Sequence, residues 1–327
     1  MTMFASISRV AVLVLFSLAA NAAIAEPLAY PPRAIRFVVP FQAGGAVDIM
    51  ARRVGQYLSE RWGQSVVVDN RPGAGGTLGA DVVAKAEPDG LTLLVTPQGP
   101  LVVNPFLMKN VPYDAAKAFA PVTVIAQAPN VVALSPSKGL KTVAELLSYG
   151  KAKGRLTFAT QGAGTTGHIT GELMARAVGV PMTHVPYKGF PGMLADVTTG
   201  RVDMLITDTF NVVPRVRAKE LHALAVSSTQ RSSVLPEVPT FPEAGYPNVI
   251  AGPWFSIVAP AGTPIEIRAR LAEAVRNLLK TPEMVRDLAN LGTDPVGSTP
   301  AEFERFYETE YKRWGEIIRA ANITLSH

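Results

Sequence analysis

Glycine-rich segments that follow predicted strands are the parts of this sequence best suited to chemistry. Three of them, residues 43–45, 73–77 and 162–167, each join the end of an apolar strand to the start of a helix. Turns of this kind present free backbone N–H groups and the positive end of a helix dipole to an anion. A single loop is better explained by tight-turn chemistry alone. Three such loops at one sheet edge favour binding of carboxylate groups without an arginine in the pocket.

Polar side chains accompany these loops. Threonine hydroxyls cluster at the same predicted edge, and they can donate hydrogen bonds to carboxylate oxygens without adding charge. Gln42 and Gln98 flank the same edge. The candidate ligand-binding residues are Phe41, Gln42, Ala43, Gly44, Gly45, Asp48, Thr96, Gln98, Thr160, Gly162, Ala163, Gly164, Thr165, Thr166, His168 and Asp208.

Three ionisable candidates each have two interpretations. Asp48 lies near the start of a predicted helix, where an acid usually caps the helix, although it could also accept a hydrogen bond from a ligand ammonium or hydroxyl group. Asp208 ends a predicted strand, and a ligand contact and a loop contact are equally compatible with that place. His168 follows the third glycine loop, and there a structural hydrogen bond is the simpler interpretation.

An enzymatic function is the main alternative. Gly162, Gly164 and Gly167 have the spacing of a dinucleotide-binding fingerprint between a strand and a helix, which would suit an exported oxidoreductase. That fingerprint also requires an acid at the end of the next strand, and residues 185–189 contain none. The sequence has no G-x-S-x-G elbow and no P-loop pattern. We therefore expect a protein without catalytic residues or a cofactor.

Composition excludes several other classes of site. The chain of 327 residues has no cysteine and only four scattered histidines, so neither a disulfide nor a dedicated metal site is expected. The net charge of +5 is spread along the sequence without a basic run, and we therefore expect no nucleic-acid partner.

Strands and helices alternate along most of the chain, which predicts an α/β fold with mainly parallel sheets flanked by helices. Ligands of such sheets bind beyond the carboxyl ends of the strands. Strands are predicted at 35–39, 65–68, 91–95, 122–127, 130–135, 156–160, 183–185, 204–206, 221–226 and 254–259. The charged helix at 302–320 is expected to be a solvated outer element. The length favours two domains, with 125–249 inserted into a discontinuous domain formed by 26–124 and 250–327.

The amino-terminal segment predicts export. Arg9 precedes an apolar run from Val10 to Ala20, and an A-x-A cleavage site ends at Ala25. This is the layout of a signal peptide, and the apolar run is short for a membrane span. We expect residues 1–25 to be removed after Ala25 and the mature protein to be periplasmic.

Motifs in order along the mature chain resemble those of the tripartite tricarboxylate transporter substrate-binding proteins, also called Bug-type receptors. The resemblance begins with Ile35 to Phe41, Gly44-Gly45 and Asp48, and continues with Asn70 to Gly76. Later matches include Gly162-x-Gly164 with His168, Val185 to Gly189, and Ala259 to Pro264.

The resemblance implies a two-domain, type II periplasmic-binding-protein-like fold with the ligand cleft between its domains. It implies that backbone N–H groups at Ala43, Gly44 and Gly45 bind a small carboxylate, and that the opposite domain contributes Gly162 to Thr166 and Asp208. The expected partners are this carboxylate and the two membrane subunits of the transporter, with the receptor as a monomer. A sensor subunit for a signalling partner would have the same sequence features.

Overall fold

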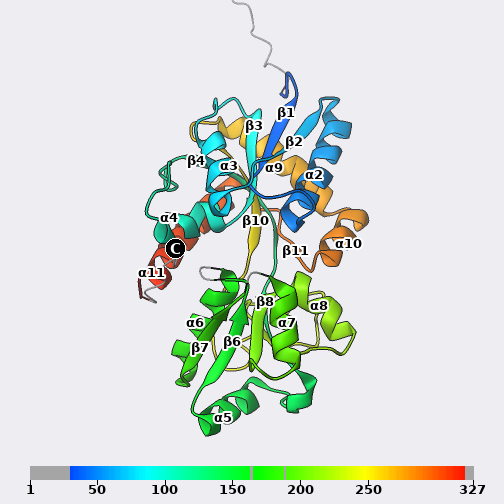
Figure 1. The fold of residues 1–327 in the computed structure, drawn as a ribbon. Coiled ribbons are helices and arrows are strands. Elements are labelled where there is room, and N and C mark those ends of the chain that lie inside the picture. Colours follow the sequence, from blue (N-terminus) through cyan, green and yellow to red (C-terminus); the bar gives the residue numbers. More distant parts are fainter. Residues whose placement is uncertain (1–29, 163–164, 188, 321–327) are drawn as a thin grey trace, which may run out of the picture. The chain divides into compact units, whose positions relative to one another are not determined.

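Two β-sheets organise the computed structural model, which describes residues 30–162, 165–187 and 189–320. All the elements below lie within one unit of the chain that begins at Arg33. The first sheet has the strand order β11-β4-β10-β3-β1-β2 and the second has the order β7-β6-β8-β5-β9. Figure 1 shows α2 and α3 beside the strands of the first sheet and α6, α7 and α8 beside those of the second.

The first sheet is built from six strands: β1 (Ile35–Val39), β2 (Val66–Asn70), β3 (Thr92–Pro97), β4 (Phe119–Gln127), β10 (Trp254–Pro260) and β11 (Asp294–Pro295). Its helices are α2 (Ala46–Trp62), α3 (Thr77–Ala84), α4 (Asn104–Leu107), α9 (Ile265–Leu279), α10 (Pro282–Asn290) and α11 (Pro300–Ala320). Short helical turns at Ala74–Gly76 and Gly99–Val103 follow β2 and β3.

The second sheet contains β5 (Asn130–Leu134), β6 (Leu156–Thr160), β7 (Met182–Pro186), β8 (Met204–Asp208) and β9 (His222–Val226). Its helices are α5 (Val143–Lys153), α6 (Thr166–Val178), α7 (Phe190–Thr198) and α8 (Thr209–Arg217), and a short turn lies at Pro136–Lys138.

The buried strands are apolar on both faces. In β5, Val132 and Leu134 belong to one hydrophobic cluster, whereas Val131 and Ala133 belong to another. Successive side chains of a strand point to opposite faces, so β5 is covered on both sides. This explains why the sequence shows continuous apolar runs instead of alternation.

Both sheets are mixed, which corrects the prediction of mainly parallel sheets. β1 pairs in parallel with β2 and β3, and β6 with β7 and β8. β10 is antiparallel to β3 and β4, and β5 is antiparallel to β8 and β9. The antiparallel strands interrupt the strand–helix alternation, since β4 is followed directly by β5 without a crossover helix.

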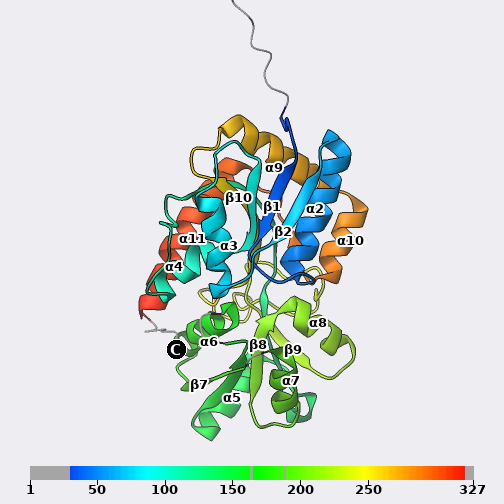
Figure 2. The ribbon, with the colours of Figure 1, turned by 45° about the horizontal axis from the view of Figure 1, so that its top comes forward.

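The last helix is also not the solvated element that its charges suggested. Phe303, Tyr307, Trp314 and Ile318 of α11 are buried in the core of the first sheet. Their spacing forms one stripe along the helix. Figure 2 shows α11 beside α4, which it contacts.

The α/β class is confirmed, whereas the domain boundaries stay a prediction. β4 belongs to the first sheet and runs to Gln127, three residues beyond the predicted boundary at 124. The predicted signal peptide lies outside the described residues.

Candidate functional site

The carboxyl ends of β1, β2 and β3 meet at one edge of the first sheet, because these strands are parallel neighbours. Asn70, at the end of β2, donates from Nδ2 to the Phe41 carbonyl at 3.1 Å and to Asp48 Oδ1 at 3.0 Å. Asn104, beyond β3, donates to the Gly75 carbonyl at 2.9 Å. The loops after β1, β2 and β3 therefore contact one another. The third predicted glycine loop, residues 162–167, instead follows β6 of the second sheet, which corrects the prediction of three glycine loops at one sheet edge.

Asp48 braces the loop after β1. Its Oδ2 accepts the backbone N–H of Gly44 at 2.9 Å and Arg52 Nε at 3.0 Å, and its side chain is 3% exposed. Burial by itself would raise the pKa of Asp48, but the hydrogen bonds from Arg52, Gly44 and Asn70 lower it overall. Asp48 is therefore an anion that shapes the loop, as its position in the first turn of α2 suggested.

The amide of Gly44 is consequently engaged within the protein, which corrects the expectation that it is a free donor. Within the described part of the chain, the N–H groups of Ala43 and Gly45 have no acceptor. Both residues are exposed, and Gly45 precedes the first turn of α2. Ala43 and Gly45 are thus the donors that this loop can offer to an anion.

The other candidates of the first sheet have structural contacts. The fully buried Thr96 donates from its hydroxyl to the Pro97 carbonyl at 2.9 Å. Gln98 accepts the Trp254 N–H on Oε1 at 3.0 Å, and its own N–H donates to the Trp254 carbonyl at 3.1 Å. The Gln98 bonds fix the end of β3 against β10, whereas the Thr96 bond stays within β3, and a ligand contact of either residue stays a prediction.

The β6–α6 loop, residues 161–165, forms the corresponding feature of the second sheet. The Thr165 side chain caps α6 by accepting the His168 N–H at 3.4 Å, and its hydroxyl donates to the Gly162 carbonyl at 2.8 Å. The Thr160 hydroxyl donates to the same carbonyl at 3.1 Å. Thr166 donates to Asn130 Oδ1 at 3.2 Å. Ala163 and Gly164, also candidates, lie outside the described residues.

Asp208 lies at the same edge as this loop, since β8 is parallel to β6. It caps α8 by accepting the Asn211 N–H on Oδ1 at 3.2 Å, and the Asn211 side chain donates to the same oxygen at 3.0 Å. Burial raises the pKa of this carboxyl group. The loop contact expected for Asp208 is therefore present, and a ligand contact stays a prediction.

His168 packs face to face with His184, with ring centroids 3.9 Å apart. Its Nε2 lies 3.7 Å from Glu172 Oε1. The sequence predicted a structural hydrogen bond for His168. It did not single out His184, nor the bridging residues Asn70 and Asn130, whose side chains connect separate segments of the chain. Asn130 is 1% exposed and donates to the Ala251 carbonyl at 3.1 Å. An asparagine at a strand terminus was the available signal for both bridging residues.

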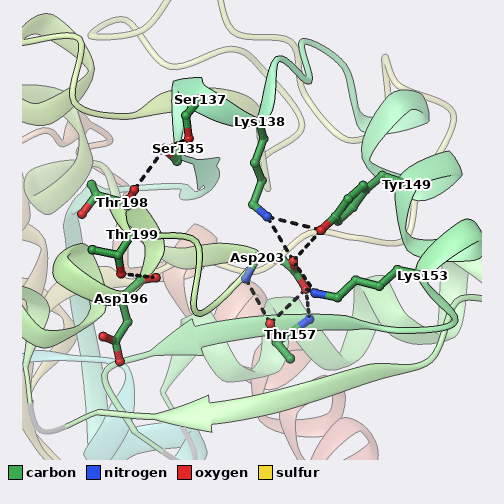
Figure 3. Close-up of polar contacts among 10 residues, drawn as sticks. All are labelled: Ser135, Ser137, Lys138, Tyr149, Lys153, Thr157, Asp196, Thr198, Thr199 and Asp203. Atoms are coloured by element: carbon green, nitrogen blue, oxygen red, sulfur yellow. Dashed lines mark hydrogen bonds and ion pairs between the residues drawn. The ribbon is translucent and has the colours of Figure 1, made fainter.

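A buried charged cluster lies at the other end of the second sheet (Figure 3). Asp203 is fully buried. Its carboxylate accepts hydrogen bonds from Lys153 Nζ at 2.8 Å, from Lys138 Nζ at 3.2 Å and from the Thr157 backbone N–H at 2.9 Å. Thr157 and Asp203 lie at the amino ends of β6 and β8, opposite the loops described above. This cluster is fully paired, and we assign it to stability.

Other kinds of site are not found in the described residues. No group of three or more His, Asp or Glu side chains there could hold a metal ion. None of the described helices has the length and apolar character needed to cross a bilayer.

Comparisons with known proteins agree with this architecture. Residues 50–323 match the model of the tripartite tricarboxylate transporter family receptor. The chain is 36% identical to the protein BugT of Bordetella pertussis over 311 residues, covering 94% of this chain and 95% of BugT.

Two similar solved structures contain carboxylates. Rpa4515 of R. palustris with adipate is 37% identical, with a TM-score of 0.76 and coverage of 90% of this chain and 100% of the other. MatC (Rpa3494) from Rhodopseudomonas palustris with bound malate is 32% identical, with a TM-score of 0.71 and coverage of 88% and 100%. The fold is thus that of a two-domain, type II-like periplasmic binding protein. Sequence motifs, sheet architecture and these relatives together establish that the chain belongs to the receptors of the tripartite tricarboxylate transporter family.

Proposed function

We propose that this protein captures a small organic carboxylate in the periplasm and delivers it to a tripartite tricarboxylate-type transporter by closure of two domains around the ligand. The family membership carries this proposal, and the adipate and malate bound by two similar proteins indicate dicarboxylates as the first ligands to test. Closure of two lobes by a hinge is a common way for such receptors to respond to a ligand.

The proposed grip consists of backbone donors. One carboxylate group would accept hydrogen bonds from the N–H groups of Ala43 and Gly45 at the start of α2. The loop at Gly162 to Thr166, with Asp208 beside it, would contact the other end of the ligand from the second domain. Backbone amides and helix termini supply this positive potential without a charged side chain.

A thermal-shift series tests the class of ligand. Adipate, malate and other carboxylates are compared with a neutral sugar and a polyamine at equal concentrations. A ligand that binds only the folded state raises the melting temperature in proportion to the logarithm of its concentration above Kd. The proposal expects such a rise with at least one carboxylate. A rise with the sugar or the polyamine alone would contradict it.

The proposal includes no chemical turnover. NMR spectra of a stabilising carboxylate recorded before and after prolonged incubation with the protein should be identical. Appearance of a product signal would favour the exported oxidoreductase instead.

Export and assembly complete the proposal. The periplasmic fraction should contain a chain that begins at Glu26, because cleavage is proposed after Ala25. Light scattering should give the mass of one chain, and the two membrane subunits of the transporter should be required for uptake. A sensor role would instead leave uptake intact in a deletion strain and abolish a transcriptional response.

A further inference from the structure

A stack of aromatic rings supports the β6–α6 loop from behind. The ring of His184 of β7 stacks on that of His168 of α6, at 3.9 Å and 13° between ring planes, and lies beside that of Phe158 of β6, at 5.1 Å and 28°, while the rings of Phe158 and His168 are 6.4 Å apart. Three elements therefore hold the imidazole of His184 in one orientation. These ring contacts fix the orientation of the imidazole, whose nitrogen atoms make their hydrogen bonds at the ring edge.

The edge of His184 meets Thr160. Nε2 lies 2.6 Å from Thr160 Oγ1, and this hydroxyl oxygen also accepts the Gly162 N–H at 3.3 Å. The same hydroxyl is within 3.1 Å of the Gly162 carbonyl. Thr160 is fully buried. One hydroxyl group thus contacts both polar atoms of Gly162, and His184 is the side chain that fixes it.

We infer that His184 is a positioning residue for the β6–α6 loop, because it orients the Thr160 hydroxyl and thereby holds Gly162 in its conformation. The inference rests on the proposed function, in which this loop contacts the ligand. A histidine two positions before the end of β7 would then control a loop at the end of β6 without touching the ligand.

The charge state of the ring suits this task. Burial and the neighbouring His168 lower the pKa of His184 to about 4, with Glu172 opposing them. The charged and titratable groups on the elements packed against the ring are His168, Glu172 and Arg176 of α6. With its proton on Nε2, the neutral imidazole donates to Thr160 Oγ1, and the Thr160 hydroxyl hydrogen is then available for the Gly162 carbonyl.

The test compares His184→Phe, which keeps the ring stack but removes Nε2, with His184→Gln, whose amide can occupy the Nε2 position. Amide hydrogen exchange at Gly162 and Thr165 is measured by NMR in the ligand-free protein. We expect exchange about tenfold faster in His184→Phe, as for one lost buried hydrogen bond, and within about threefold of the parent in His184→Gln. His222→Phe, a matched change on β9, should leave both amides unaffected.

Thr160→Val provides the second variant, since it removes the hydroxyl and keeps the side-chain shape. It should accelerate the same amides, and combining it with His184→Phe should add no further effect. Unchanged exchange in both single variants, or fully additive effects in the double variant, would overturn the inference. Affinity for adipate or malate should fall in parallel with exchange. If the parent protein binds no carboxylate, the proposed function fails while the exchange data still decide the role of His184.

Discussion

The Asp48 carboxylate accepts the Gly44 amide at 2.9 Å, across the loop that joins β1 to α2. This bond closes a tight turn in which Gly44 has φ of 86°, a conformation that favours glycine. Since Arg52 and Asn70 also bind Asp48, the loop is shaped by protein contacts. The neighbouring amides of Ala43 and Gly45 are thereby left available for an anion.

Asp48→Asn tests this arrangement. The amide can replace only one of the two acceptor oxygens, so either Asn70 loses its acceptor or Gly44 and Arg52 both do. We expect affinity for a bound carboxylate to fall by about tenfold or more and stability by about 1–2 kcal/mol. Calorimetric titration and urea unfolding measure the two quantities. Asp287→Asn, which removes the charge from a surface pair with Arg53, should change neither appreciably. An unchanged affinity in Asp48→Asn would show that ligand binding does not need the hydrogen bonds accepted by the Asp48 carboxylate.

Asp208→Asn separates the capping role of Asp208 from its charge. Asparagine caps helices as well as aspartate, so α8 should be retained. Burial raises the pKa of Asp208, so the protein loses stability as the pH rises above the unfolded-state pKa, and this loss is complete above the folded-state pKa. The variant should therefore melt a few degrees higher at pH 7, and its advantage should vanish below about pH 4, where the unfolded-state carboxyl is also protonated. Asp208→Ala, which loses the cap, should be less stable by about 1 kcal/mol. A lower melting temperature for Asp208→Asn at pH 7 would contradict this account.

Asp203→Asn should be strongly destabilising. It leaves Lys153 and Lys138 without their buried partner, which typically costs about 3–5 kcal/mol. Burial by itself would raise the pKa of Asp203, but bonds from Lys153, Thr157 and Lys138 lower it overall. The ionised Asp203 carboxylate therefore contributes its full share to the folding stability above the unfolded-state pKa. This stabilisation is lost as the pH falls through the folded-state pKa. Unfolding free energies measured from pH 7 to pH 3 should show that the difference in stability between the parent protein and Asp203→Asn becomes smaller as the pH falls. Asp114→Asn, in an exposed pair with Lys117, serves as the control and should cost under about 1 kcal/mol.

His184 should make the protein acid-sensitive. Its pKa is about 4 in the folded state, below the ordinary value of 6.5, so the unfolded chain binds the proton more readily between these values. This contribution of the neutral His184 ring to stability is complete above pH 6.5 and is lost as the pH falls towards 4. Melting curves across this range should fall less steeply for His184→Gln than for the parent. Equal slopes would mean that the His184 ring is not kept neutral by folding.

The sequence predicted the strands of the central sheets well because apolar runs such as Ile35–Val39 and Leu156–Thr160 are bounded by turn residues. It did not predict α8, because this helix contains Pro214 and because its N-cap residue, Asp208, was assigned to a strand end and not to a helix cap. Too many strand pairs were also predicted to be parallel, because the residue pattern within one strand carries no information about the direction of the neighbouring strands.

The candidate site was predicted in outline. Glycine loops and helix starts can be recognised locally, which placed the residues from Phe41 to Asp48 and from Thr160 to His168. The partner of each donor depends on contacts between distant segments. The bond between Asn70 and Phe41 spans 29 positions and that between His184 and Thr160 spans 24, and neither leaves a local pattern.

The most direct measurement of the central claim is calorimetric titration of a dicarboxylate into the parent protein, Gly45→Pro and Gly45→Ala. Gly45 has φ of −79°, which proline accepts, so Gly45→Pro removes the donor N–H with little change in the backbone. The alanine variant keeps the N–H, and its added Cβ would have no neighbour closer than the Gln42 carbonyl oxygen at 3.7 Å. We expect one carboxylate per chain to bind the parent and Gly45→Ala alike, and about tenfold or more weaker binding to Gly45→Pro. Equal binding to all three, or no binding of any carboxylate to the parent, would contradict the account.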